Sequence, residues 1–410
     1  MTEPPQLPPV GEEQASEESL AERYGVLQRA GGIVAPLLTV VLAFFLGGVV
    51  VLATTGSVGK TVDTYAAIFD GTGLNWLFPW VTGDERVVAA SNFQQTLIVW
   101  IPLVLTGLAV AFAFRCGLFN IGGNGQYMAG SIMSILVAGE LAKAWDMPGL
   151  VLILVTVVCA TVAGAVLAGI AGFLKGTVGA HEVITTIMLN WIMVWVGSYL
   201  FGVGGPFQTD VDPALPVSSD IAEKARLHVF WGHPLLQGLH VGLFVSLVAL
   251  VVYWLTLNRT TLGFQVRAVG HNPEAARYGG ISVARNYFLA MAFAGSFAGL
   301  AGAMDVLGWK FRLDITDLQG STIGFIGIAV ALLGRNTAVG VGLAALLFAA
   351  LQTGTSTRNL DPAVFEPELA TSLTLIIQGL VILFVGADVI VLLALRQLRR
   401  RRGKAEGAPT

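Results

Sequence analysis

The chain has 410 residues, of which 55% are hydrophobic and only 12% are charged. A soluble domain carries about 25% charged residues, so this composition fits a lipid bilayer rather than water. The net charge of −3 is too small to indicate nucleic-acid binding. Cys116 and Cys159 lie in or beside apolar segments and are predicted to be packing residues, and the five histidines show no metal-ligand spacing. We therefore expect no metal and no cofactor.

Residues 1–29 form a polar tail rich in Pro and Glu, which we expect to be a disordered cytoplasmic segment. The tail is longer and more acidic than the basic start of a signal peptide. The first apolar run is therefore expected to stay in the chain as a membrane anchor.

Ten apolar stretches are candidates to cross a membrane, which takes roughly 20 residues per helix. They lie near 31–53, 94–114, 118–139, 149–173, 183–203, 238–257, 286–307, 321–334, 338–353 and 369–395. The eighth and ninth are short and adjacent, and are alternatively one long helix broken at Gly334–Arg335–Asn336. The chain is thus predicted to be an all-α polytopic membrane protein, with one transmembrane domain over 30–395 and a basic cytoplasmic tail over 396–410.

Lys and Arg predict the orientation, because cytoplasmic loops carry an excess of them. With both termini in the cytoplasm, fifteen of the 23 Lys and Arg residues fall inside and eight outside. Two long connections, 54–93 and 204–237, then lie outside, and the long loop 258–285 lies inside. The aromatic residues of the outside connections are either interfacial anchors or a docking surface for an external partner.

Small residues recur at four-residue spacing in two predicted spans, over Gly164–Ala168 and Gly295–Ala303. This pattern predicts close helix packing in lipid. Ionisable residues within the spans are few. Asp388 is expected to pair with Arg335 or the basic tail, and Asp305 is expected at a wet outer helix end. Because no relay of buried Asp, Glu and His crosses the predicted spans, the sequence argues against a proton-driven mechanism.

The stretch Thr54–Thr61 looks like a phosphate-binding loop, but it lacks the first glycine and follows an apolar span instead of a strand. We therefore predict that the chain is not an enzyme. If ATP powers its activity, another subunit hydrolyses the nucleotide.

The inside loop carries the signals of a short helix. Asn272 suits an N-cap, Pro273 the first helical position and Glu274 the first turn. Gly279 and Gly280 end the helix after about one and a half turns. Such a helix is either a rigid element that transmits force or a solvated connecting turn.

Two further segments place polar groups in the membrane. Four glycines and three amides gather over Gly117–Gln126, at the entry to the third span, and Glu182, Thr186 and Asn190 form one stripe along a predicted helix. Buried amides are costly unless they are hydrogen-bonded. These groups are therefore either interhelical bonds or the lining of a solute path.

These three segments resemble one family. The sequence Glu274–Ala275–Ala276 with glycine shortly after looks like the coupling loop of ABC importer permeases for branched-chain amino acids, simple sugars and nucleosides. The run Phe119–Asn120–Ile121–Gly122 with Gly125–Gln126 and the run Glu182–Asn190 are similar to the nucleoside and simple-sugar branch. His181 stands where that branch usually has Asn, so no role is carried to it. The resemblance covers about 95–385.

The resemblance implies a permease of the vitamin B12-type, ten-helix architecture in the bacterial plasma membrane. It implies cytoplasmic ABC ATPase subunits, a second permease that is a paralogue or a second copy, and an extracytoplasmic solute-binding lipoprotein. The predicted substrate-pathway residues are Phe119, Asn120, Asn124, Gln126, Glu182, Thr186 and Asn190. The predicted ATPase-coupling residues are Arg267, Asn272, Pro273, Glu274, Ala275, Ala276, Arg277 and Gly279.

We expect the solute to be a nucleoside. The alternative within the class is a simple sugar, because a polar lining does not separate a free sugar from a ribose that carries a base. An ion-coupled secondary transporter and a membrane-embedded enzyme are the alternatives from other classes, but the sequence shows neither an ionisable relay nor a catalytic constellation for them.

Overall fold

The computed structural model describes residues 36–54, 56–212, 214–232, 238–356, 375–381 and 383. The chain divides into two compact units, and the description below concerns the unit Val51–Ile376, apart from the helix Pro36–Thr54, most of which belongs to the other unit. The predicted tails, 1–29 and 396–410, and Asp388 lie outside the described residues, as does most of the predicted span 369–395.

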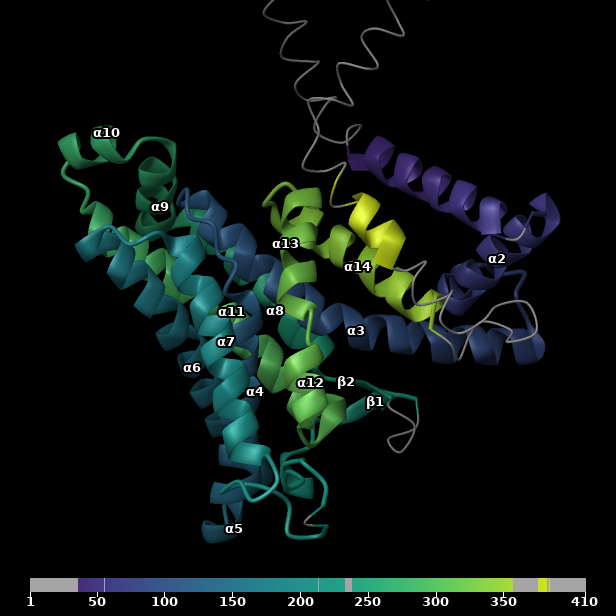
Figure 1. The fold of residues 1–410 in the computed structure, drawn as a ribbon, viewed down its shortest axis with the longest axis horizontal. Coiled ribbons are helices and arrows are strands. Elements are labelled where there is room, and N and C mark those ends of the chain that lie inside the picture. Colours follow the sequence, from purple (N-terminus) through teal and green to yellow (C-terminus); the bar gives the residue numbers. More distant parts are fainter. Residues whose placement is uncertain are drawn as a thin grey trace, which may run out of the picture. The chain divides into compact units, whose positions relative to one another are not determined.

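The described chain is almost entirely helical (Figure 1). Its α-helices are Pro36–Thr54, α2 (Val58–Gly71), α3 (Gly83–Arg115), α4 (Gly123–Ile135), α5 (Ala142–Ala144), α6 (Gly149–Val178), α7 (Glu182–Phe201), α8 (Gly242–Arg259), α9 (Thr261–His271), α10 (Pro273–Tyr278), α11 (Val283–Asp305), α12 (Ile315–Gly320), α13 (Ile323–Leu333) and α14 (Ala338–Gly354). The 3₁₀ turns are η1 (Leu74–Leu77) and η3 (Glu223–Ala225), and the π-helical turns are η2 (Leu136–Leu141) and η5 (Val306–Lys310). The strands β1 (Val229–Trp231) and β2 (Leu239–His240) pair antiparallel.

Seven helical segments of the described residues are long and apolar enough to cross a membrane, and α14 is a shorter apolar helix. The all-α polytopic class is therefore confirmed, while the number of ten spans stays a prediction. The eighth and ninth predicted spans are two separate helices, α13 and α14. Arg335 and Asn336 between them adopt left-handed backbone angles, with φ of 51° and 52°, which break the helix.

The connection 54–93 is largely helical, which the sequence analysis did not anticipate. Ser57 caps α2, and α3 begins at Gly83, eleven residues before the predicted span. Asp84 and Glu85 lie in the first turn of α3, where the positive end of the helix dipole favours carboxylates. These charges favour the early start of α3. A hydropathy window scores the same charges as unfavourable, so the predicted span began later.

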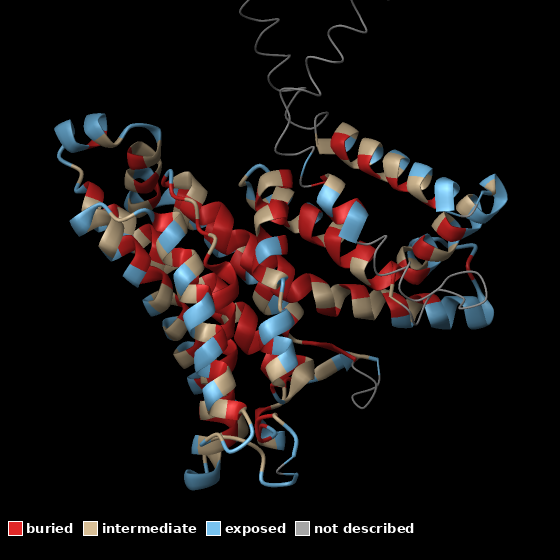
Figure 2. Cartoon of the chain, in the orientation of Figure 1, coloured by how far each residue is buried: buried red, intermediate tan, exposed pale blue. Residues whose placement is uncertain are grey.

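The core forms where α11 packs against α6, α3 and α4, and the buried residues concentrate there (Figure 2). Small residues make this possible. A methyl group placed on Gly164 of α6, or on Gly130 of α4, would lie 2.7 Å from Cα of Gly299 in α11. The prediction of close packing through glycine is thus confirmed, because no side chain fits between these backbones.

The connection between α7 and α8 is fastened to the segment after α11. The backbone N–H of Ser218 donates to the carbonyl of Leu313 at 2.8 Å, and the N–H of Leu227 donates to the carbonyl of Leu307 at 2.8 Å. The N–H of Ile221 donates to Phe311 at 2.9 Å. This half of the connection is therefore a fixed part of the unit.

Candidate functional site

The helix α10 has the predicted caps at both ends. The side chain of Asn272 accepts a hydrogen bond from the N–H of Ala275 at 3.1 Å, and Pro273 opens the helix. Gly279 follows its last residue, and Gly280 has a left-handed φ of 79°. The predicted boundaries of the short helix are thus confirmed.

Most of α10 is exposed. Ala276 is its one buried residue, whereas Tyr278 is 93% exposed. Glu274 and Arg277 face each other on the surface at 3.6 Å. The predicted coupling residues Ala275 and Gly279 are also exposed. A short, stiff and uncovered helix is the form expected of an element that docks to another protein.

The preceding helix α9 was not predicted. The hydroxyl of Thr260 caps it by accepting from the N–H of Gly263 at 3.1 Å, and Val266 and Val269 anchor one side of it in the unit. The predicted coupling residue Arg267 lies on α9 and is only partly exposed. The inside loop is thus an α9–α10 pair, so α10 sits on a folded base.

The glycine-rich entry to α4 is held by amide groups that bond to each other. The side chain of Asn120 donates to Gln126 at 3.0 Å, and Gln126 donates back to Asn120 at 2.8 Å. The same oxygen of Asn120 accepts from the N–H of Gly122 at 3.0 Å. Both amides are buried. They satisfy each other and one backbone donor of the broken segment, as burial requires.

The polar stripe of α7 reaches the same segment. Asn190 accepts from the N–H of Gly125 at 2.8 Å and donates to the carbonyl of Ile121 at 3.0 Å. A methyl group on Gly122 would lie 2.9 Å from Cβ of Thr186, so that residue also touches the segment. The structure therefore brings Asn120, Gln126, Thr186 and Asn190 together in one amide cluster.

The other predicted pathway residues lie around this cluster. Asn124 accepts from the hydroxyl of Ser321 at 3.1 Å, which links α4 to the start of α13. Glu182, at the first position of α7, pairs with Lys175 at 2.9 Å. Phe119 stacks on Phe114 with ring centroids 5.1 Å apart and takes no part in the amide bonds.

A charged cluster beside these groups was missed by sequence reasoning. Asp305 is 2% exposed, so the expectation that it lies in water was wrong. It accepts from the hydroxyl of Tyr127 at 2.5 Å and from the indole N–H of Trp309 at 2.9 Å. The ammonium of Lys310 lies 3.4 Å from Asp305 and donates to Tyr127 at 3.1 Å. The signal was in the sequence, because an Asp, Trp and Lys end one apolar span, and ionisable residues in a span mark a functional site by default.

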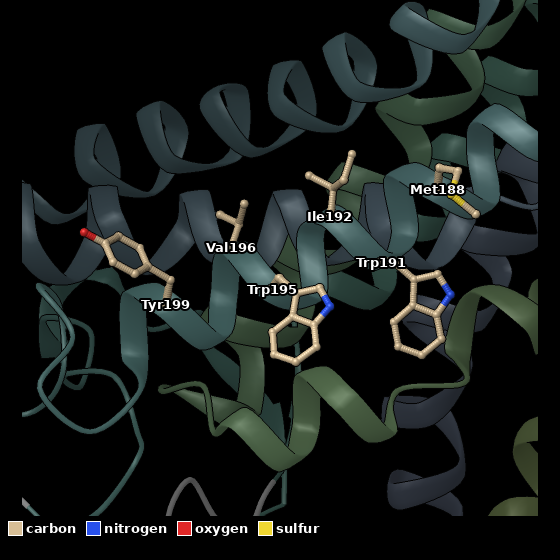
Figure 3. A pocket seen from close by; sticks show the side chains of 6 residues that line it. All are labelled: Met188, Trp191, Ile192, Trp195, Val196 and Tyr199. Atoms are coloured by element: carbon tan, nitrogen blue, oxygen red, sulfur yellow. The ribbon is translucent and has the colours of Figure 1, made fainter.

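The outward side of α7 carries an open groove of about 510 Å³, whose lining side chains are shown in Figure 3. Trp191, Trp195 and Tyr199 recur there every four residues and are 59%, 67% and 72% exposed. The lining is apolar, so it suits a lipid tail or another apolar helix rather than a polar solute. The described residues contain no cluster of His, Cys, Asp and Glu that could hold a metal ion.

A polytopic helical bundle with a capped, exposed helix on one side and a polar cluster among its spans defines the class of a membrane transport subunit. Residues 92–386 match the family described as the permease component of the branched-chain amino acid transport system, and the chain belongs to that family. No solved structure matches the chain.

Several characterised relatives are similar over most of their length. The chain is 33% identical to the guanosine ABC transporter permease NupP of Bacillus subtilis over 92% of this chain and 99% of that protein. It is 34% identical to the nucleoside ABC transporter permease NupB of Lactococcus lactis, covering 88% and 92%. It is also 34% identical to the glucose ABC transporter permease TsgB13 of Haloferax volcanii, covering 85% and 86%. The chain is thus a multi-pass transport component of an ABC system, a family that implies an ATPase and a solute-binding protein.

Proposed function

We propose that this chain is the permease subunit of an ATP-driven nucleoside importer. The observation that carries the proposal is the near full-length similarity to two permeases that are named for guanosine and nucleosides. A simple sugar is the second candidate, because the glucose permease of Haloferax volcanii is similar to the same extent over slightly less of the chain.

The exposed α10 supports docking of a cytoplasmic ABC ATPase. Its N-cap and glycine end fix its length, and its exposed side chains leave a surface for a partner to hold. ATP binding in the partner would move α10, and α9 would pass the motion to the bundle. This assignment would place the α9–α10 side in the cytoplasm of a bacterial cell. We propose from the distribution of Lys and Arg along the sequence that both chain termini lie there as well.

The proposed assembly contains more than this chain. A second permease, a paralogue or a second copy, would complete the pathway. A lipid-anchored solute-binding protein would deliver the nucleoside to the opposite side, where the 204–237 connection lies. These partners follow from the family and from the predicted orientation.

We further propose that the amide cluster lies along the solute pathway, with Glu182 near its inner gate. In the described conformation the amides bond to each other and to the backbone of residues 121–125. A passing solute would exchange hydrogen bonds with them, so the segment would rearrange during transport. Changing Asn120 or Asn190 to Ala should therefore alter both the uptake rate and the preference between solutes. Asn258→Ala on α8, where an exposed amide bonds only within its helix, is the matched control.

The proposed function is tested by uptake of radiolabelled guanosine, uridine and glucose in cells that lack this chain and in cells to which it is restored. Restored nucleoside uptake that stops on ATP depletion, but survives collapse of the proton gradient, supports the proposal. Glucose uptake alone would favour the sugar permease. Uptake that persists without ATP would refute an ABC mechanism.

A further inference from the structure

The charged cluster around Asp305, which sequence reasoning missed, forms the floor of a pocket of about 340 Å³. Tyr127 and Asp305 at the floor are buried, and Trp309 and Lys310 are partly exposed. The rim includes exposed residues of α12 and of the turn before α13, among them Asp317. The volume lies in the range of about 300–1,000 Å³ that is usual for small-ligand sites. The pocket is therefore large enough for a solute and opens away from the core.

A cluster of buried ionisable groups is unusual at the end of a membrane span. A buried ion pair stabilises little, because desolvating both charges offsets most of their attraction. Here an aspartate, an ammonium and a phenol are kept together among apolar helices. Asp305 immediately precedes the π-helical turn η5 and Lys310 ends it, while Tyr127 reaches them from α4. Such turns are frequent at functional sites. This cost is explained if the groups serve a ligand.

The chemistry of the pocket selects a class of ligand. Trp309 is partly exposed and offers a ring face for a planar base, whereas Tyr127 is buried. The carboxylates of Asp305 and Asp317 and the ammonium of Lys310 line the pocket and offer acceptors and donors for hydroxyl groups. Asp305 and Asp317 carry two negative charges against the one positive charge of Lys310. The excess negative charge disfavours a phosphate, so the pocket suits a neutral solute with a planar ring.

The pocket is also connected to the amide cluster and lies far from α10. Ser321 lines the pocket and donates to Asn124, which is two residues from Gln126 in the chain. Asp305 is 22 residues beyond Val283 on the continuous helix α11. At 1.5 Å per residue this separation is about 33 Å, roughly the thickness of a bilayer core. Figure 1 accordingly shows α10 and α12 at opposite ends of the bundle.

We propose that this pocket is the outer solute subsite of the permease, where the base of an incoming nucleoside stacks on Trp309 and its hydroxyls bond to Asp305 and Lys310. The inference rests on the proposed nucleoside function and deepens it. The subsite would receive the solute on the side opposite the ATPase and pass it toward Asn124. It would also reject nucleoside phosphates by charge.

The test is binding of tritiated guanosine to the complete permease–ATPase complex in nanodiscs, without the external binding protein. Omitting that protein matters, because its own affinity would otherwise dominate the measurement. Trp309→Leu should weaken guanosine binding about tenfold, because it removes the ring on which the base stacks. Trp309→Phe keeps a ring and should weaken it less. Trp254→Leu removes an outward-facing Trp of α8 and should leave binding unchanged.

A second variant, Asp305→Asn, tests whether the negative charge of the pocket excludes phosphates, because it should allow a nucleoside phosphate to bind. Guanosine monophosphate should not compete with guanosine in the unaltered complex. Asp305→Asn removes one negative charge while keeping the shape of the side chain, so the monophosphate should then compete. A folding defect produces no such gain.

The outcomes separate this inference from the proposed function. If cells take up guanosine but the complex does not bind it, or binds it equally well with Trp309→Leu, the pocket is only a structural brace and the inference is overturned. Equal competition by glucose would overturn the stacking of a base. If cells bearing the unaltered chain take up no nucleoside, the proposed function fails first.

Discussion

Replacing Gly299 with alanine tests the packing on which the bundle depends. The added methyl group would lie 3.1 Å from both Cα and N of Gly164, and it would meet the carbonyl of Ala160 still more closely. These neighbours are backbone atoms of α6, so they move only if the whole helix moves. The change therefore acts on the interface between α6 and α11 rather than on one side chain.

The magnitude follows from two opposing effects. Overpacking a tight interface costs about 1–3 kcal/mol, and alanine gains about 0.5–1 kcal/mol over glycine within a helix. The expected net loss in free energy of unfolding is about 1–2 kcal/mol. Gly342→Ala in α14 is the matched control, because the nearest atom to its added methyl group is a Leu250 side-chain carbon at 3.5 Å. That variant should be neutral or slightly stabilised.

The assay is SDS-induced unfolding of the two purified variants in mixed micelles, followed by tryptophan fluorescence. Gly299→Ala should unfold at lower SDS than the unaltered chain, and Gly342→Ala should not. Equal stability of all three proteins would refute the reasoning, because it would mean that α6 and α11 do not approach at these glycines.

Three further predictions concern α10, the ion pair of Lys175 and Glu182, and His240. Asn272→Ala removes the N-cap of α10, which is worth about 1 kcal/mol, and should lower uptake per ATP hydrolysed while Asn258→Ala does not. Lys175→Glu or Glu182→Lys alone should reduce uptake, and the double swap should restore part of it, as double-mutant uptake assays will report. Burial lowers the pKa of His240, in β2 ahead of α8, to about 4, so the unfolded chain binds the proton more readily. Stability should fall as the pH drops from 6.5 toward 4, by up to about 3 kcal/mol, and His240→Leu should flatten that slope in a pH series of SDS titrations.

Local signals in the sequence predicted the short helix α10 and its boundaries well. Asn272, Pro273 and Gly279 act within a few residues of their own position, so their effect does not depend on the rest of the fold. The split between α13 and α14 was one of two predicted readings, because Gly334–Asn336 marked a break without stating its geometry. The positions of most spans follow from hydropathy, which also reports on nearby residues only.

The charged cluster depended on one distant residue and on the geometry of a local turn. Asp305 is buried because Tyr127 packs on it from α4, and Lys310 meets it because a π-helical turn changes the usual spacing. Tyr127 is not visible from the sequence around Asp305, and the meeting of Asp305 with Lys310, five residues later, depends on the backbone of the turn. Because Asp305 ends an apolar run, the sequence predicted contact with water. The amide cluster was predicted as a set of residues, but its pairing was not, because Asn190 reaches residues 121 and 125 across 65 or more positions of the chain.

The hydrogen bonds between the α7–α8 connection and the segment after α11 divide that connection into two parts with different tolerance to engineering. Residues 218–227 form a splint along 307–313. Removing 218–227 would loosen the backbone that holds Lys310 at the pocket. The earlier part touches the splint at Gln208 and Thr209, where the N–H of Thr209 donates to the carbonyl of Val217 at 2.9 Å. Val203 and Val211 on either side of this contact are 70% and 92% exposed. An epitope or fluorophore inserted beside Val203 or Val211 should therefore report on the outer surface without disturbing the permease, whereas the same insertion at 218–227 should impair it.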